Sequence, residues 1–164
     1  MFAKILVAID QSSLGDHVFS KALSLAKELK SELMLLHVLS SDEEGSPQLS
    51  LSPSVGTSLP LDSAALELYR EQWTHYEQAG IAFLQTHVKA ATSAGVKAEF
   101  TQTPGHPGRA ICHLAKTWGA DLIVVGRRGR TGLSELFLGS VSNYVVHYAP
   151  CEVLTIHTHH PSEN

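Results

Sequence analysis

The sequence is poor in cysteine, carries no excess of positive charge and contains no long apolar run. Its two cysteines, Cys112 and Cys151, form no CxxC motif, which argues against a disulfide framework or a structural zinc site. The 12 Lys and Arg residues are outnumbered by 16 Asp and Glu residues, so nucleic acid is not expected as the main partner. No stretch approaches the about 20 apolar residues of a membrane span, and the N-terminus resembles a core strand rather than a signal peptide. These absences favour a reducing cytoplasm as the compartment.

The length and composition predict one globular domain over residues 1–164, with 43% hydrophobic and 17% charged residues. One segment, 41–62, does not fit a packed element. It contains Pro47, Pro53, Pro60 and many serines, and it has too few apolar groups to offset the entropy of ordering it. We expect a flexible insertion there, which is either tolerated without a role or serves as a lid.

Short apolar runs recur along the chain. The runs 5–9, 33–39 and 122–125 are nearly continuous and rich in β-branched residues, which is typical of strands covered on both faces in a parallel sheet. The run 96–100 alternates between apolar and polar residues, which favours a half-exposed strand near an edge. A last short strand is predicted at 153–156.

Helical patterns separate these runs. One begins after Ser13, whose spacing to Asp16 resembles a capping box. Three more are predicted over 63–94, 107–118 and 139–148. Strict alternation of strands and helices predicts a doubly wound α/β fold with a parallel sheet between two helical layers. In such folds ligands bind at the carboxyl ends of the strands, where the strand order reverses.

The stretch from Gly126 to Ser142 is the most informative part of the sequence. It directly follows the strand predicted at 122–125 and ends by opening a helix. Glycines let the backbone approach a ligand closely, and a helix start offers unpaired N–H groups, so the stretch fits a phosphate. The alternative is that the glycines only shape a turn. The stretch contains neither the P-loop motif GxxxxGK[ST] nor the dinucleotide motif GxGxxG.

The glycine spacing Gly126-x2-Gly129-x9-Gly139-Ser140 matches the ATP-binding signature of universal stress proteins. The blocks KILVAIDQSS, LLHV, TPGHPGRAI, GADLIVVGRRGR and GSVSNYVVHYAPCEVLTI extend the resemblance to that family over nearly the whole chain. The resemblance implies a Rossmann-like, adenine nucleotide alpha hydrolase-like fold with five parallel strands in the order 3-2-1-4-5. It also implies a homodimer paired through the last strand, near Val153 to Ile156.

The resemblance further implies a role for individual residues. Asp10 would bind the ribose hydroxyls, since a carboxylate can accept two hydrogen bonds from a diol. Val38 would contact adenine, largely through its backbone. The ligand would be ATP or AMP, with Mg²⁺ held mainly by the phosphates. The remaining predicted contacts are Ala8 and Ile9 beside the nucleoside, Gly126, Arg127 and Gly129 along the nucleotide, and Gly139, Ser140, Val141 and Ser142 at the phosphates.

Several of these residues also have simpler interpretations. Asp10 could be a helix cap or turn residue, and Val38 could be only a core residue. Arg128 and Arg130 could belong to a solvated face, and His106 is more often a turn residue than a base. The histidines near the C-terminus fit an exposed tail.

Three functions agree with the sequence. The first is an ATP-binding stress or signalling regulator. The second is a slow ATPase that uses the same pocket, which ranks lower because the sequence shows no convincing general base. The third is a nucleotide-free scaffold or chaperone-like protein of the same fold. Nothing in the sequence names a protein partner.

Overall fold

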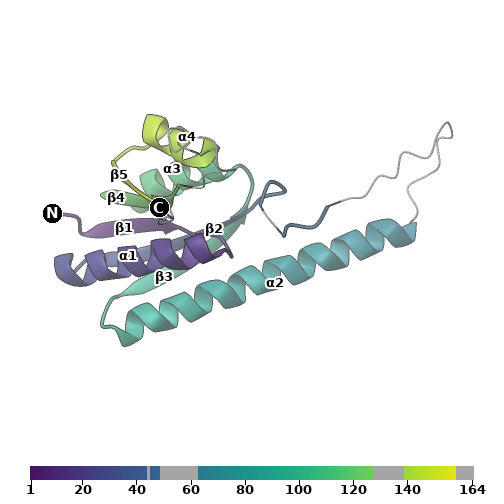
Figure 1. Ribbon diagram of the computed structural model, residues 1–164, viewed down its shortest axis with the longest axis horizontal. Helices are drawn as coiled ribbons and strands as arrows, with labels where there is room; N and C mark the ends of the chain where they lie inside the picture. Colours follow the sequence, from purple (N-terminus) through teal and green to yellow (C-terminus); the bar gives the residue numbers. More distant parts are fainter. Residues whose placement is uncertain (44, 49–62, 128–138, 158–164) are drawn as a thin grey trace, which may run out of the picture.

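The computed structural model describes residues 1–43, 45–48, 63–127 and 139–157. The five strands form one parallel sheet in the order β3-β2-β1-β4-β5 (Figure 1), which confirms the predicted fold. The strands are β1 (Lys4–Ala8), β2 (Glu32–Leu39), β3 (Ala98–Pro104), β4 (Leu122–Gly126) and β5 (Glu152–Ile156).

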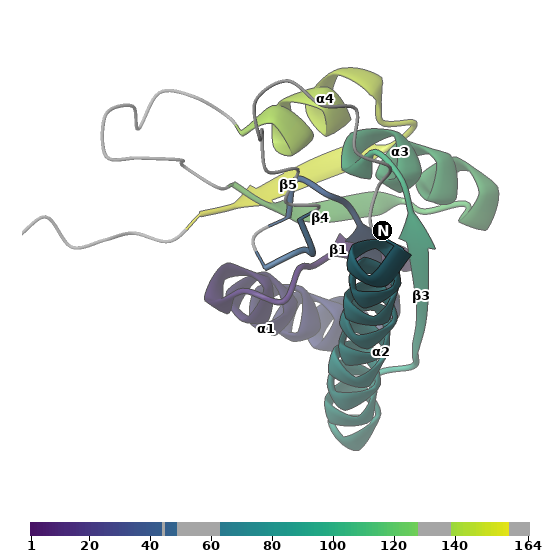
Figure 2. The same ribbon diagram turned by 90° about the vertical axis from the view of Figure 1, so that its right-hand side faces the viewer.

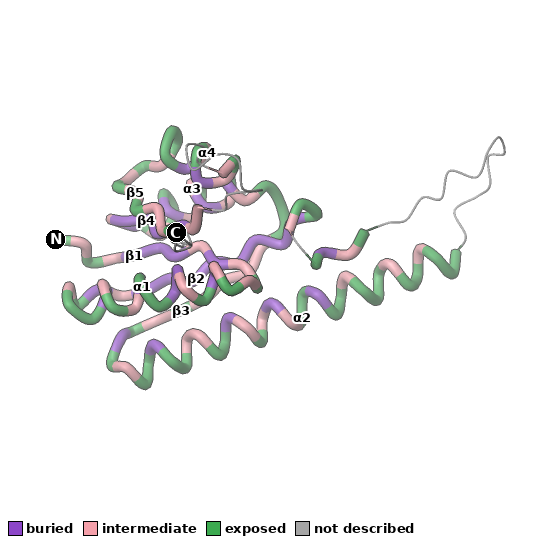
Figure 3. The backbone as a smooth tube through the Cα atoms, in the orientation of Figure 1, coloured by how far each residue is buried: buried purple, intermediate pink, exposed green. Residues whose placement is uncertain are grey.

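Four helices connect the strands and cover both faces of the sheet. They are α1 (Ser13–Leu29), α2 (Ser63–Ser93), α3 (Pro107–Trp118) and α4 (Ser140–Tyr148). Figure 2 shows α1 and α2 on one side of the sheet and α3 and α4 on the other. The N-terminal part of α2 projects beyond the sheet (Figure 1), and its residues there are mostly exposed (Figure 3). None of the described helices is long and apolar enough to cross a membrane.

The central strands are apolar on both faces because both faces are covered. Ile5 and Val7 of β1 belong to the core beneath α1 and α2, whereas Leu6 belongs to the core beneath α3 and α4. The same alternation continues in β2, where Leu33 and Leu35 face α1 and α2. His37 therefore falls on the α2 side of the sheet, in an otherwise apolar row.

The third strand lies at an edge of the sheet, as its alternating pattern predicts, and most of its residues are half-buried. It begins two residues later than predicted. Val96 instead completes the turn after α2, because its N–H donates to the carbonyl of Ala91 at 3.0 Å. Val96 is apolar and buried there, so its hydrophobicity reflects the core under the turn rather than a strand.

The segment after β2 forms a compact turn as far as it is described. The N–H of Glu43 donates to the Ser40 carbonyl at 3.2 Å, and the N–H of Ser46 donates to the Glu43 carbonyl at 3.1 Å. The Ser46 hydroxyl also donates to the Ser41 carbonyl at 2.9 Å. Residues 49–62 of the predicted insertion lie outside the described residues, so the insertion and the single domain over 1–164 stay predictions.

Candidate functional site

The strand order reverses between β1 and β4. From β1 the chain passes through α1 to β2 on one side, and it enters β4 on the other side from β3 through α3. Ala8, in the last position of β1, pairs with Leu36 of β2 and Val125 of β4. Ile9 continues the strand line, since its N–H donates to the Leu36 carbonyl at 2.9 Å. Ala8, Ile9 and Gly126 thus lie at the carboxyl edge where ligands bind in this architecture.

Asp10 organises the turn between β1 and α1. Its Oδ1 accepts hydrogen bonds from the N–H of Ser12, at 3.2 Å, and from the Ser12 hydroxyl. The Ser12 Oγ in turn accepts from the N–H of Gly15 at 3.3 Å, which makes Ser12 the N-cap of α1. The prediction that Ser13 caps this helix is wrong by one residue, because the Asp10 turn places Ser12 before the first helical turn. Asp10 therefore stabilises the turn before α1, which is the simpler of its two predicted roles. Its contact with ribose stays a prediction.

Two glycines allow α1 to lie close to the site. A Cβ on Gly15 would stand 2.0 Å from the main-chain oxygen of Asp10, and a Cβ on Gly126 would stand 3.1 Å from atoms of Leu14 and Val18. Real Cβ contacts are rarely that short, so both positions favour glycine for packing. Gly126 therefore has a packing reason to be glycine in addition to its predicted place along the nucleotide.

The start of α4 has no side-chain cap among the described residues. Gly139 is the N-cap of this helix. Ser140 is exposed, and Val141 is half-buried. Ser142 is buried, and its hydroxyl donates to the Gly139 carbonyl at 3.2 Å. The N–H groups of this first turn and the Ser140 hydroxyl are thus candidate donors for an anion.

The other predicted residues have different surroundings. The Val38 side chain is 8% exposed and packs in the core beneath α3 and α4, so only its backbone is left for a ligand. The N–H of Arg127 donates to the Ile156 carbonyl at 2.6 Å, which continues the pairing of β4 with β5. Gly129, like Arg128 and Arg130, lies outside the described residues.

Next to this edge the structure contains a buried polar cluster that the sequence patterns did not predict. His37 of β2 is 1% exposed. Its Nδ1 lies 2.8 Å from Oε1 of Gln102 on β3, and its Nε2 lies 3.0 Å and 3.1 Å from the two carboxylate oxygens of Glu43. The Tyr76 hydroxyl of α2 donates to the same carboxylate. The sequence feature that could have indicated this cluster is His37, a single histidine inside the apolar run 33–39.

The ionisation of this cluster follows from its contacts. Burial acts to lower the pKa of His37, but hydrogen bonds to Glu43 and Gln102 and the charges of Glu43 and Asp10 outweigh it and raise that pKa. Burial likewise acts to raise the pKa of Glu43, but hydrogen bonds from His37 and Tyr76 lower it below its usual value. Both shifts favour an ion pair of imidazolium and carboxylate.

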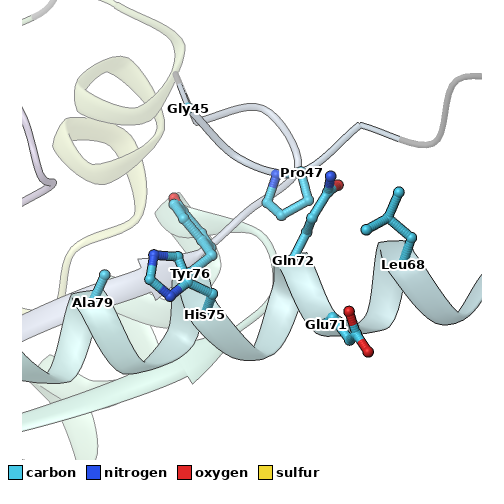
Figure 4. A pocket seen from close by; sticks show the side chains of 8 residues that line it. All are labelled: Gly45, Pro47, Leu68, Glu71, Gln72, His75, Tyr76 and Ala79. Atoms are coloured by element: carbon cyan, nitrogen blue, oxygen red, sulfur yellow. The ribbon is translucent and has the colours of Figure 1, made fainter.

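A separate cavity of about 520 Å³ lies between α2 and the segment after β2. Figure 4 shows Tyr76 reaching from α2 towards the chain near Gly45 at this cavity. None of the predicted nucleotide contacts lines it; its lining residues are Gly45, Pro47, Leu68, Glu71, Gln72, His75, Tyr76 and Ala79. Among the described residues no group of three or more His, Cys, Asp and Glu side chains could hold a metal ion.

Known structures share this architecture. The universal stress protein UspA from Lactobacillus plantarum is 27% identical, with a TM-score of 0.65, over 94% of this chain and 97% of its own. A universal stress protein family protein from Arabidopsis thaliana, solved with AMP bound, is 24% identical, with a TM-score of 0.61, over 98% of this chain and 94% of its own. Other universal stress proteins of similar fold were solved in complex with cAMP and with dAMP.

The sequence comparison covers almost the whole chain. Residues 1–157 match the universal stress protein family. The universal stress protein Sll1388 of Synechocystis is 37% identical over 155 residues, which span 94% of this chain and 97% of the relative. The matched range spans the segments that contain the Asp10 turn, the buried cluster and the glycine-rich stretch. This chain belongs to the universal stress protein family.

Proposed function

We propose that this protein binds an adenine nucleotide, ATP or AMP, at the carboxyl edge between β1 and β4, and that it acts as a nucleotide-dependent stress or signalling regulator. The observation that carries the proposal is the arrangement of the Asp10 turn and β4 at the point where the strand order reverses. The start of α4, without a side-chain cap, follows β4 in the chain. The nucleotide complexes of proteins with this fold support the same choice of ligand.

The chemistry of each part fits a nucleotide. The Asp10 carboxylate would accept hydrogen bonds from the ribose hydroxyls, and the Val38 backbone would contact adenine. The N–H groups of Ser140, Val141 and Ser142, with the positive end of the α4 dipole, would hold the phosphates. The backbone from Gly126 through Arg127 and Gly129 would follow the nucleotide. Magnesium, where present, would neutralise the phosphates and bind mainly to them.

Nucleotide binding at this site could regulate the protein if the bound and free forms differ in conformation and therefore in their contacts with a partner. A ligand that binds one conformation better than another shifts the population towards it. The two cysteines are free thiols, which supports our proposal of a reducing cytoplasm as the compartment. We also propose a homodimer through β5, an edge strand whose backbone pairs on one side with β4.

Calorimetric titration with ATP, AMP, adenosine and GTP tests the function directly. We expect the wild type to bind the adenine nucleotides more tightly than GTP. Asp10→Ala should lower the affinity for ATP and for AMP alike, because both carry the ribose. Ser140→Ala should lower the affinity for ATP more than that for adenosine, which has no phosphate. Ser24→Ala, an exposed serine of α1, should change neither affinity and serves as the control.

The absence of adenine nucleotide in the denatured purified protein, together with no heat on titration, would contradict nucleotide binding and favour the scaffold function. Steady release of phosphate from ATP, abolished by Gly139→Val, would instead favour the slow ATPase. Gly139 is the N-cap of α4, so a valine there would crowd the phosphates without touching Asp10.

A further inference from the structure

The buried cluster around His37 extends to the turn that holds Asp10. Glu43 Oε1, in addition to its contact with His37, accepts a hydrogen bond from the N–H of Gln11 at 3.4 Å. Gln11 directly follows Asp10 in the chain, between β1 and α1. One carboxylate thus connects β2, the segment after β2, helix α2 and the turn at the predicted ribose contact.

The hydrogen bonds determine which atoms of His37 carry protons. The Nε2 of Gln102 donates to the Glu77 carbonyl at 3.0 Å, so the Gln102 Oε1 is the atom that faces His37 and must accept from its Nδ1–H. The Nε2 of His37 faces a carboxylate and must also be a donor. At pH values between the lowered pKa of Glu43 and the raised pKa of His37, both ring nitrogens therefore carry hydrogen, and His37 is an imidazolium paired with an ionised Glu43.

The packing of α2 leaves little room for another arrangement. A Cβ on Gly80 would stand 2.1 Å from Gln102 Oε1 and 2.7 Å from His37 Nδ1, so α2 closes directly over the pair. Tyr76, one turn earlier, donates its hydroxyl to Glu43. The Glu43 carboxylate thus receives hydrogen bonds from His37, Tyr76 and Gln11, and a buried ion pair of this kind is stable only while its partners remain in place.

We propose that Glu43 is a positioning residue of the nucleotide site: held by buried His37 and Tyr76, it fixes the main chain at Gln11 and thereby presents the Asp10 carboxylate in a single orientation. The effect on nucleotide affinity rests on the proposed function, whereas the fixing of Gln11 does not. Ordering this turn before binding would reduce the entropy lost when a nucleotide binds.

The positioning depends on pH through the charges that face His37. These are the carboxylate of Glu43, the carboxylate of Asp10, which acts at longer range, and the polar groups of Gln102 and Tyr76. When pH rises through the raised pKa of His37, the ring loses one proton and one of its two donated bonds. Glu43 is then held less firmly, and nucleotide affinity should fall.

The first experiment needs no nucleotide. In amide NMR spectra of the full chain, the Gln11 N–H should be protected from exchange, and its chemical shift should follow the titration of His37. Glu43→Gln, which keeps an acceptor oxygen but no charge, should remove the titration, and Glu43→Ala should remove the protection as well. Glu67→Gln and Glu67→Ala, at an exposed position of α2, should leave both unchanged. A Gln11 amide that is indifferent to Glu43→Gln would overturn the proposal, whether or not the protein binds nucleotide.

The second experiment measures affinity for AMP against pH. A parallel series with adenosine, which carries the ribose but no phosphate, separates the titration of His37 from the second ionisation of the AMP phosphate near about pH 6. Glu43→Gln should weaken binding about three- to tenfold and flatten the fall in affinity with rising pH, and His37→Gln should flatten it too. Equal pH profiles in wild type and Glu43→Gln would overturn the proposal. No binding by a wild type whose Gln11 amide still titrates would instead contradict the proposed function.

Discussion

Gly80 shows how a single residue can be fixed by a distant part of the chain. Glycine inside a helix normally costs stability relative to alanine, by about 1 kcal/mol. Here it lies in the middle of α2, where a side chain would collide with Gln102 and His37. The helix accepts the cost of glycine because the buried ion pair occupies the space that a side chain would take.

We therefore expect Gly80→Ala to destabilise the protein by about 1–3 kcal/mol, the usual cost of overpacking, although helix propensity alone predicts a gain. Urea unfolding measures the change. Ala82→Gly, at an exposed position of the same helix, should lose about 1 kcal/mol from propensity only. An increase in stability for Gly80→Ala would show that α2 does not close over His37.

His37 makes stability depend on pH with a definite sign. The pKa of His37 is raised above the ordinary value of 6.5. Its contribution to the free energy of unfolding is therefore complete below about pH 6.5 and is lost as pH rises through the raised pKa. The pKa of Glu43 is lowered from 4.5, so its contribution is present above about pH 4.5 and is lost as pH falls through the lowered pKa. The pair stabilises the fold most between these two limits.

Denaturant unfolding at several pH values should show this loss on the alkaline side. His37→Gln should remove the part of the slope above about pH 6.5 that belongs to the imidazolium. His113→Gln, which replaces an exposed histidine of α3, should retain the wild-type slope. A His37→Gln variant with an unchanged slope would mean that His37 is already neutral in the native protein.

Among the elements, α1 and α4 begin near the site in different ways. The first turn of α1 is capped by Ser12, which is itself held by Asp10. The first turn of α4 follows Gly139 and has no side-chain cap among the described residues. The cap of α1 uses the N–H of Gly15 within the protein, whereas the start of α4 has no side-chain acceptor for its N–H groups in the described part of the chain. This difference supports the proposed placement of the phosphates at α4 and of the ribose at the Asp10 turn.

The capping of α1 can be tested by two neighbouring serines. Ser12→Ala should destabilise the protein by about 1 kcal/mol, because the Gly15 N–H loses its side-chain acceptor. Ser13→Ala, at the first helical position, should have almost no effect. Thermal or urea unfolding of both variants decides between them, and the opposite order of effects would restore Ser13 as the cap.

The strand boundaries show how accurately polarity patterns in the sequence predict where strands begin and end. Four strands were predicted to within one residue, because a buried strand in a parallel sheet is apolar on both faces and is bounded by polar residues. The third strand was misplaced by two residues at its start, since Val96 is buried under a turn. Apolar character reports burial, and burial alone does not distinguish a strand from a packed turn.

At the scale of the whole molecule, the two sheet edges differ. The edge strand β3 packs against α2. At the other edge, the large exposed apolar residues of the described chain include Val146 and Tyr148 of α4 and Leu154 of β5, which is 39% exposed. An open strand edge beside apolar side chains favours self-association, which supports the proposed homodimer.

Leu154→Lys tests this interface without disturbing the core. Two lysines brought together across paired β5 strands would repel each other, so we expect a shift from dimer to monomer in sedimentation velocity. Leu68→Lys, at a 55% exposed leucine on the projecting part of α2, should leave the dimer intact. A wild type that sediments as a monomer, or a Leu154→Lys variant that remains dimeric, would contradict pairing through this strand.

The amino-acid sequence was sufficient to predict the order of strands and helices along the chain, the family and the glycine-rich stretch after β4, because each depends on residues close together in the chain. The three-dimensional packing was needed to show that Ser12 caps α1, that Gly126 packs against Leu14 and that Gly80 has no room for a side chain. The same holds for the pairing of His37 with Glu43 and Gln102. These contacts depend on the angle and distance at which helices cross a twisted sheet, and local patterns of polarity do not encode that geometry.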